Sequence, residues 1–217
     1  MIQQNINRIK EELGETVLVA VSKYRTLHEL NELYETGQRI FAENRVQELL
    51  SKVEALPKDI EWHLIGHLQT NKVKSVISKV SLIHSVDSLK LIKEIQKESA
   101  KAGIMSRMLL QIHVATEDSK FGFDPSKLVE LTGSGTLNDF PNIQFCGIMS
   151  MATLTEDVVQ IESEFKKTIE VFEKLKSHMP NPSLFKELSM GMSSDYKIAL
   201  KKGATMVRIG SKIFVNT

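Results

Sequence analysis

Lys23 is the residue whose position suggests chemistry most directly. It follows the apolar run Val17-Leu-Val-Ala-Val-Ser22, which is typical of a buried strand. A lysine flanked by such a strand is partly desolvated, and desolvation disfavours the charged ammonium form. A neutral amine can condense with an aldehyde to form an imine. The alternative is a solvated lysine at a strand end, so the hypothesis needs support from other residues.

Two turns rich in glycine and serine suggest a phosphate site. Ser189-Met-Gly-Met-Ser193 and Gly210-Ser211 each follow an apolar run. Such turns expose backbone N–H groups, and a helix dipole favours an anion at the start of a helix. Ser193 or Ser194 could instead only cap a helix. Two such turns exceed what capping requires, and together with Lys23 they suit a phosphorylated aldehyde.

Arg208 lies inside an apolar run, between Val207 and Ile209. An arginine buried in a strand is costly unless it meets an acceptor. One possible partner is a carboxylate in a structural salt bridge. The other is a ring nitrogen, which arginine would leave unprotonated because it keeps its own proton.

No other catalytic or metal-binding motif is recognisable. His63 and His67 are four residues apart, but Ile65 and Gly66 between them indicate a strand end and not a helix. No Cys or carboxylate cluster accompanies them, so we expect no metal site. The hydrolase elbow, the P-loop and the dinucleotide-binding glycine motif are all absent from the sequence.

The composition is typical of a cytoplasmic protein. Of the 217 residues 41% are hydrophobic but only 6% are aromatic, so we expect an aliphatic core. The net charge is +1 with both signs interspersed, which argues against nucleic acid or an anionic membrane as a partner. The start resembles no signal peptide, and no apolar run approaches the roughly 20 residues that cross a bilayer. Cys146 is the one cysteine, expected as a buried thiol.

Short apolar runs alternate with helical patterns along the chain. Strands are predicted at Val17–Ser22, Arg39–Ala42, Trp62–Ile65, Leu82–Val86, Met108–Val114, Ile143–Met149, Glu187–Met190 and Met206–Ile209. Helices are predicted at Gln4–Leu13, Thr26–Gly37, Val46–Leu56, Gln69–Ser78, Ser88–Ala102, Pro125–Thr132, Glu156–Met179 and Ser193–Lys202.

Eight strand–helix steps favour a parallel sheet closed into a (β/α)8 TIM-type barrel over an open sheet. The strands lack polar alternation, as parallel strands buried on both faces do. Without a linker, residues 1–217 are predicted to form a single domain. The first helix could plug the bottom of the barrel, and Ser211–Thr217 is too short for a full eighth helix. In such a barrel Lys23, Arg208 and both turns meet at the carboxyl ends of the strands.

The chain resembles the pyridoxal phosphate homeostasis proteins, which are single-domain relatives of the N-terminal barrel of alanine racemase. Seven ordered blocks carry the resemblance: Ala20-Val-Ser-Lys23, Glu43-Asn-Arg-Val-Gln-Glu48, Trp62-His-Leu-Ile-Gly-His-Leu-Gln-Thr-Asn-Lys72, Glu117-Asp-Ser-Lys120 with Gly122, Gly147-Ile-Met-Ser-Met151, Leu188-Ser-Met-Gly-Met-Ser193 with Asp195, and Val207-Arg-Ile-Gly210 with Ile213-Phe214. The chain departs from the usual pattern at Ala42, His113 and Val215, and His113 could alter the polarity of the mouth.

The resemblance implies that Lys23 holds pyridoxal 5′-phosphate (PLP) as an internal aldimine. It places Arg208 at the pyridine nitrogen. The cofactor-binding residues that it implies are Lys23, Asn44, His67, Met149, Ser189, Gly191, Ser193, Arg208, Gly210 and Ser211. The implied role is intracellular PLP homeostasis without an established reaction, and apo-enzymes that use PLP are the implied partners.

Two other functions remain open from the sequence. One is a PLP-dependent amino-acid racemase, which would need a second base opposite the lysine, and Tyr24, Tyr34 and Tyr196 are the tyrosines available. The other is a barrel that binds a phosphosugar without a cofactor. We expect a monomer, because a barrel sealed by its own helices needs no partner, although weak dimerisation is compatible with the sequence.

Overall fold

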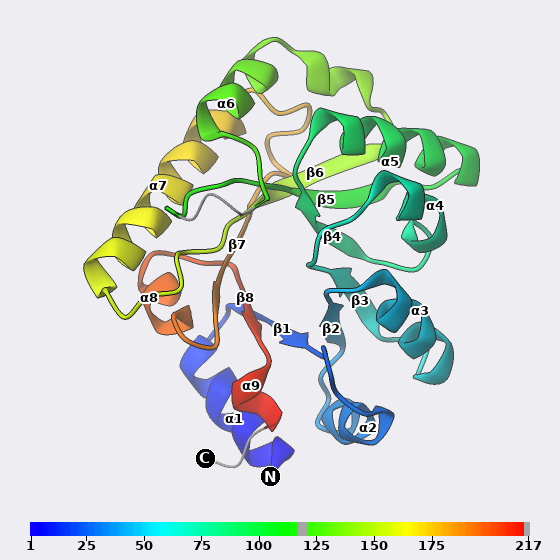
Figure 1. Ribbon diagram of the computed structural model, residues 1–217, viewed down its shortest axis with the longest axis vertical. Coiled ribbons are helices and arrows are strands. Elements are labelled where there is room, and N and C mark those ends of the chain that lie inside the picture. Colours follow the sequence, from blue (N-terminus) through cyan, green and yellow to red (C-terminus); the bar gives the residue numbers. More distant parts are fainter. Residues whose placement is uncertain (117–120, 215–217) are drawn as a thin grey trace.

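Eight parallel strands close into a barrel with neighbours in sequence order, and β8 pairs with β1 (Figure 1). The computed structural model describes residues 1–116 and 121–214. The strands are β1 (Val17–Val21), β2 (Ile40–Glu43), β3 (Glu61–Leu64), β4 (Leu82–Val86), β5 (Ser106–Gln111), β6 (Ile143–Met149), β7 (Glu187–Met192) and β8 (Met206–Ile209). The predicted (β/α)8 barrel is therefore confirmed.

Helices surround the barrel on the outside (Figure 1). They are α1 (Ile2–Leu13), α2 (Leu27–Glu35), α3 (Val46–Ala55), α4 (Val73–Val76), α5 (Leu89–Ala102), α6 (Pro125–Gly133), α7 (Val158–Lys176), α8 (Tyr196–Lys201) and α9 (Ser211–Phe214), with short 3-10 turns η1 (Thr70–Lys72) and η2 (Thr136–Asp139). In α7 the apolar stripe predicted from Ile161 to Leu175 is buried, and the Asp157 side chain caps the first turn.

The inside of the barrel is packed with side chains from alternate strand positions, as a period of two requires. Its apolar part is a cluster of Val19, Ala42, Leu82, Leu109, Cys146, Met149 and Met206. Cys146 is a buried free thiol, as expected. The neighbours of these residues in the strands, such as Leu18 and Val207, face outward and pack against the surrounding helices.

Helix α1 does not plug the bottom of the barrel, contrary to expectation. It packs on the outer wall, where its Asn5 amide donates to the Ile213 carbonyl at 3.1 Å, and Figure 1 shows α1 and α9 side by side. The reason is that α9 has only four residues and leaves the outer face of β1 and β8 uncovered. The buried side chains of Ile6, Ile9 and Leu13 cover that face, and burying each is worth about 1.5–3 kcal/mol.

The predicted helix bounds differ from the structure by one to a few residues, and two of the differences have a clear physical reason. The helix expected over 69–78 is instead η1 followed by the single turn α4, neither of which has a side-chain cap. β-branched Val73, Val76 and Ile77 lose rotamer freedom in a helix, which weakens a longer one. The helix expected from Ser193 begins at Tyr196, because β7 continues to Met192.

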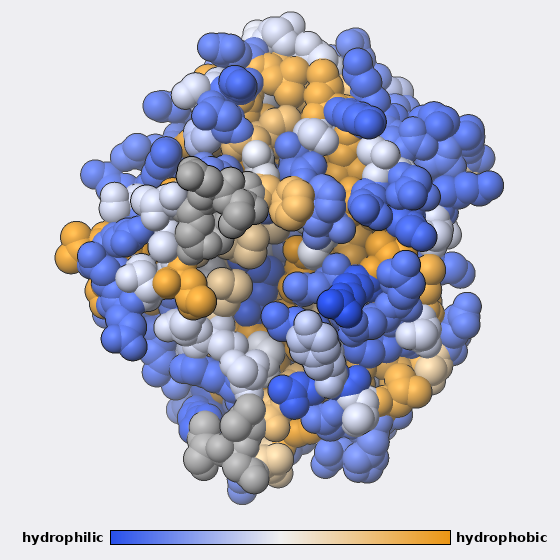
Figure 2. Space-filling view, viewed as in Figure 1, coloured by the Kyte–Doolittle hydropathy of each residue, from blue (hydrophilic) through white to orange (hydrophobic). Residues whose placement is uncertain are grey.

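The face of the molecule in Figure 2 is covered mainly by hydrophilic residues, with smaller hydrophobic areas between them. This agrees with the interspersed charges of the sequence. Within residues 1–116 and 121–214, no helix has both the length and the apolar character needed to cross a membrane.

Candidate functional site

A cavity of about 500 Å³ opens at the carboxyl ends of the strands. Residues from the loops after β1, β2, β3, β6, β7 and β8 line it, so distant parts of the chain meet there. The lining consists of Val21, Lys23, Asn44, Ile65, Met151, Met192, Ser193, Ser194, Arg208, Gly210, Ser211 and Lys212. Two lysines, one arginine and several serines therefore border a single space.

Six of the ten predicted site residues line this cavity: Lys23, Asn44, Ser193, Arg208, Gly210 and Ser211. The structure does not bring His67, Met149, Ser189 or Gly191 into the lining. Met149 and Ser189 are fully buried in the barrel below the cavity. Gly191 packs toward α8, where an added Cβ would lie 2.6 Å from the Ala199 Cβ. This glycine therefore serves the close approach of β7 and α8.

Lys23 lies two residues past the end of β1, and its side chain is exposed. The expectation that the apolar strand partly desolvates Lys23 is wrong, because the open cavity leaves the Lys23 amine accessible to solvent. Tyr24, the next residue, adopts φ 62°. This left-handed conformation is strained for a residue with a Cβ. It turns the backbone directly after the lysine, and Tyr24 is 74% exposed.

A buried ion pair supports the chain on both sides of Lys23. Glu43, at the end of β2, is fully buried and pairs with the Lys52 ammonium, so it does not line the cavity. The Ser22 hydroxyl lies 2.6 Å from the same carboxylate, and Lys52 Nζ donates to the Ser22 carbonyl at 2.8 Å. The residues that precede Lys23 and Asn44 are thereby tied together. Gly66 also packs against Asn44, since an added Cβ would lie 2.1 Å from the Asn44 carbonyl oxygen.

The two glycine–serine turns are joined by a hydrogen bond. The Gly210 N–H donates to Ser193 Oγ at 3.3 Å. Asp195 occupies the N-cap position of α8, and its carboxylate accepts from the Met192 N–H at 2.5 Å. Neither Ser193 nor Ser194 is the N-cap residue, so the purely capping interpretation of these serines is wrong. Both serine side chains remain available at the cavity.

Arg208 is 3% exposed and points into the barrel, where neutral acceptors hold it. Its Nη1 donates to the Ser189 carbonyl at 2.8 Å and to Ser189 Oγ at 2.6 Å, while Nη2 donates to the Ser150 carbonyl at 2.8 Å. Burial lowers the pKa of Arg208 to about 10, although the charge of Asp195 acts in the opposite direction. The guanidinium therefore stays charged at neutral pH, and it borders the cavity.

Two buried histidines lie beneath Arg208. His84 Nδ1 is 2.9 Å from Ser189 Oγ, and His84 Nε2 is 3.0 Å from His63 Nδ1. Burial lowers the pKa of His63 to about 3, and the charge of Arg107 acts in the same direction. Burial also lowers the pKa of His84 well below its usual value. The sequence suggested only that His63 lies in a strand, and it did not single out His84.

His67 lies outside the cavity lining. Its ring stacks on Phe121 with 4.0 Å between centroids, and its Nδ1 lies 3.0 Å from the Asp87 carboxylate. His113, expected at the end of the fifth strand, lies two residues past β5, and its buried Nδ1 has no hydrogen-bond partner among the described residues. The block 117–120 and the departure at Val215 lie outside the described residues.

Lys212 is a lining residue that the sequence reasoning missed. It follows the turn after β8, and its Nζ also lies 5.0 Å from the centroid of the Tyr196 ring. Its position two residues after Gly210 was the available signal. A second cation near both turns strengthens the electrostatic attraction for an anionic group.

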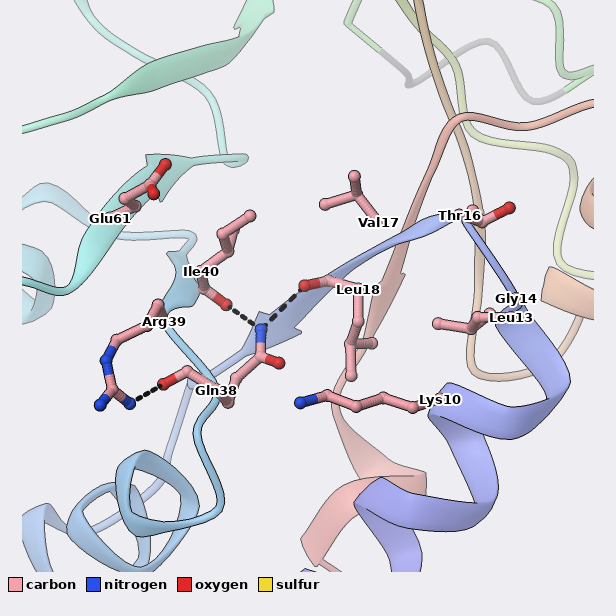
Figure 3. A pocket seen from close by; sticks show the side chains of 10 residues that line it. All are labelled: Lys10, Leu13, Gly14, Thr16, Val17, Leu18, Gln38, Arg39, Ile40 and Glu61. Carbon is pink, nitrogen blue, oxygen red and sulfur yellow. Dashed lines mark hydrogen bonds between the residues drawn. The ribbon is translucent and has the colours of Figure 1, made fainter.

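Another cavity, of about 370 Å³, lies at the opposite end of the barrel (Figure 3). The hydrogen-bond donors that line it are already paired within the protein. The Gln38 amide donates to the Leu18 and Ile40 carbonyls at 2.9 and 2.8 Å. Arg39 donates to the Gln38 carbonyl and pairs with Asp59. Barrels of this kind place their sites at the other end, where the loops that follow the strands gather. The 500 Å³ cavity is therefore the candidate functional site.

Comparison with known proteins identifies the family to which the chain is related. The chain matches the family described as "Alanine racemase, N-terminal domain" over residues 1–217. It is 41% identical over 198 residues to a pyridoxal phosphate homeostasis protein of Aquifex aeolicus, covering 91% of this chain and 85% of the relative. The human protein of the same name is 35% identical over 225 residues, covering 98% of this chain and 82% of the relative.

Solved structures give the same result. PipY of Synechococcus elongatus PCC7942, solved without PLP, superposes with a TM-score of 0.93 at 32% identity, over 99% of this chain and 100% of PipY. PipY with PLP bound superposes with a TM-score of 0.90, also at 32% identity and over the same shares of both chains. An alanine racemase from Corynebacterium glutamicum shares the fold at 14% identity, with a TM-score of 0.81 over 100% of this chain and 61% of the racemase. By sequence and by fold, the chain belongs to the pyridoxal phosphate homeostasis protein family, whose barrel is that of the alanine racemase N-terminal domain.

Proposed function

We propose that this protein binds PLP reversibly and acts in PLP homeostasis inside the cell. The observation that carries the proposal is the meeting of Lys23, Arg208 and the two glycine–serine turns around one cavity of about 500 Å³. PLP presents an aldehyde, a ring nitrogen and a phosphate. The cavity presents an amine, a guanidinium and a set of hydroxyl and backbone N–H groups, so each part of the ligand has a chemical counterpart. The PLP-bound PipY structure gives independent support.

In this proposal Lys23 Nζ forms a Schiff base with the aldehyde of PLP, with release of water. Ser193, Gly210 and Ser211 receive the phosphate, and Lys212 adds a positive charge beside it. Arg208 donates to the ring nitrogen. Bound PLP supplies an electron sink for carbanion chemistry, and this sink is strong only when its ring nitrogen is protonated. An arginine partner keeps its own proton and leaves the ring neutral, which disfavours such chemistry.

The proposal is of a non-catalytic carrier, and the alternative is an amino-acid racemase. A racemase needs a second base on the face opposite the lysine, and none of the three tyrosines lines the cavity. Tyr24 is exposed in its left-handed turn, and Tyr34 donates to Asp59 at 2.8 Å. Tyr196 is buried and bonds to Glu12, and its pKa is raised to about 12, first by burial. These placements favour a carrier.

Apo-enzymes that need PLP are the proposed recipients. The open mouth, where the Lys23 side chain is exposed, suits release of the ligand. We also propose that the chain acts as a single-domain monomer, because its own helices cover the barrel wall. A cytoplasmic location fits its single buried cysteine, which needs no oxidising compartment.

Two experiments test the function. The PLP-loaded protein is mixed with a PLP-dependent apo-enzyme, and recovery of that enzyme's activity is compared with recovery from the same concentration of free PLP. If PLP is transferred, the activity of the apo-enzyme recovers, and permanent retention of PLP would argue against a carrier.

The loaded protein is also incubated with single amino-acid enantiomers in deuterated water. A carrier predicts α-carbon exchange no faster than with free PLP, whereas enzymatic exchange would favour the racemase. A protein that binds no PLP at all would return the phosphosugar barrel to consideration.

A further inference from the structure

A chain of buried polar side chains crosses the barrel interior beneath Arg208. Ser189 on β7, His84 on β4 and His63 on β3 are linked by contacts of 2.9 and 3.0 Å, and none is more than 3% exposed. A polar group in such a place costs free energy unless its hydrogens meet acceptors. The proposed ligand does not touch the two histidines, so their presence needs another explanation.

Arg208 determines the direction of the hydrogen bonds that link Ser189, His84 and His63. A guanidinium only donates, so Ser189 Oγ accepts from Nη1 at 2.6 Å. The hydroxyl hydrogen of Ser189 must then point to its other neighbour, His84 Nδ1, which therefore carries no proton. A neutral imidazole has one N–H, so His84 donates from Nε2 to His63 Nδ1. His63 in turn carries its proton on Nε2.

Both rings remain neutral at physiological pH, as this order requires. Burial lowers the pKa of each histidine, and the positive charge of Arg208 acts in the same direction on His84. A doubly protonated His84 would direct an N–H at Ser189 Oγ. The hydroxyl hydrogen would then lose its acceptor inside a dry interior, at a cost typical of a buried unsatisfied group.

We propose that His84 and His63 are positioning residues that keep the Ser189 hydroxyl an acceptor for Arg208 and thereby fix the guanidinium toward the cavity. Of its five N–H donors, Arg208 uses two on Nη1 and one on Nη2. Within residues 1–116 and 121–214, one donor on Nη2 and the one on Nε meet no acceptor, so they are left for a ligand. The inference rests on the proposed function only for the identity of that ligand, the ring nitrogen of PLP.

The order of protons is tested without any cofactor. The protein is labelled with ¹⁵N-histidine, and long-range ¹H–¹⁵N correlation at pH 7.5 reports which ring nitrogen of each histidine carries hydrogen. His63→Asn and His84→Asn assign the signals. The inference predicts an unprotonated Nδ1 and a protonated Nε2 in both rings. A proton on Nδ1 of either ring, or a doubly protonated ring, overturns it.

The positioning role is tested with pyridoxine 5′-phosphate, which has the ring and phosphate of PLP but no aldehyde for Lys23. His84→Asn keeps an oxygen at the place of Nδ1, whereas His84→Leu removes the acceptor. We expect Kd to rise by about three- to tenfold in His84→Leu and by less than about twofold in His84→Asn. Ser189→Ala should resemble His84→Leu and serves if that variant does not fold.

Urea unfolding of each variant separates positioning from stability. Equal Kd values for His84→Leu, Ser189→Ala and the wild type overturn the positioning role, and so do equal losses in His84→Asn and His84→Leu. Failure of the wild type to bind PLP or pyridoxine 5′-phosphate overturns the proposed function and the ligand assignment together. The histidine spectrum, recorded on the protein alone, still decides the order of protons.

Discussion

Ser193 Oγ accepts a hydrogen bond from the Gly210 N–H at 3.3 Å, which joins the loop after β7 to the loop after β8. These loops come from adjacent strands of the barrel, and each contributes residues to the same cavity. In barrels of this type the loops after the seventh and eighth strands often form the phosphate site. The hydrogen bond therefore marks the place where we propose that the phosphate of PLP binds.

Replacing Ser193 tests this placement. Ser193→Ala removes a hydroxyl group from the cavity and an acceptor from Gly210, so we expect Kd for PLP to rise by about three- to tenfold. Kd for pyridoxal, which has no phosphate, should change little. Titration followed by the absorbance of the bound vitamer measures both values. An equal effect on the two vitamers would place the phosphate elsewhere.

The two lysines beside Tyr196 offer a matched pair. Lys212 lines the cavity, with its Nζ 5.0 Å from the Tyr196 ring centroid, whereas Lys197 lies 5.9 Å from the same ring and pairs with Glu12 outside the lining. Lys212→Gln should weaken PLP binding by about fivefold, the loss of about 1 kcal/mol from one partly exposed charge. Lys197→Gln should have almost no effect. Titrations at low and high salt should show that the difference shrinks as salt screens the charge. Equal effects of the two substitutions would remove Lys212 from the phosphate site.

The buried pair of Glu43 and Lys52 should matter for stability more than for charge. Glu43→Gln removes the nearer carboxylate from the buried Lys52 ammonium and leaves Glu48, at 3.9 Å, as its remaining ion-pair partner. We therefore expect a loss of stability of up to about 3–5 kcal/mol, the cost of breaking a buried pair. Adding Lys52→Met removes the buried charge and should recover part of the loss. Urea unfolding of both single variants and the double variant forms a complete cycle. Strictly additive losses would show that the two residues do not interact in solution.

Mild acid should destabilise the fold through the buried histidines. The pKa of His63 is lowered to about 3 in the folded protein, and that of His84 is also lowered well below its usual value, in both cases chiefly by burial. The unfolded chain therefore binds more protons below about pH 6.5, so stability is full above that pH and falls with acid. For each histidine, the free energy of unfolding should fall by up to about 2 kcal/mol between pH 7 and pH 5.

The control for this effect is His63→Asn, which keeps an acceptor for His84. Its unfolding free energy should depend less steeply on pH over the same interval, as urea unfolding at several pH values would measure. The carboxylates whose pKa is lowered, such as Glu12 and Asp124, titrate mainly below this range and leave the comparison clear. An unchanged slope would mean that His63 is not held neutral.

The fold followed from the sequence because the strands are continuous apolar runs. The predicted bounds of β4, β6 and β8 are those of the structure, since Leu82–Val86, Ile143–Met149 and Met206–Ile209 are each flanked by polar residues or turns. Lys23, Gly210 and Ser211 were found for a related reason: a residue after a parallel strand lies at the mouth of a barrel.

The direction of the side chains could not be predicted from the sequence, because it depends on partners that are distant in the sequence. Glu43 ends β2, but its carboxylate pairs with Lys52 on α3 and does not face the cavity. Ser189 is close to Gly191 and Ser193 in sequence, yet β7 continues past it and turns its hydroxyl toward His84 and Arg208. The place of α1 depends on the shortness of α9 at the other end of the chain.

Covalent mapping of bound PLP is the most direct test of whether Lys23 holds PLP. The protein is loaded with PLP, reduced with borohydride and digested, and the modified peptide is sequenced by mass spectrometry. We expect one adduct, on Lys23, that is absent in Lys23→Ala and unaffected in the exposed control Lys79→Ala. Lys23→Ala should still bind PLP weakly through the phosphate site. An adduct on a different lysine, or no adduct in the wild type, would show that Lys23 does not hold PLP.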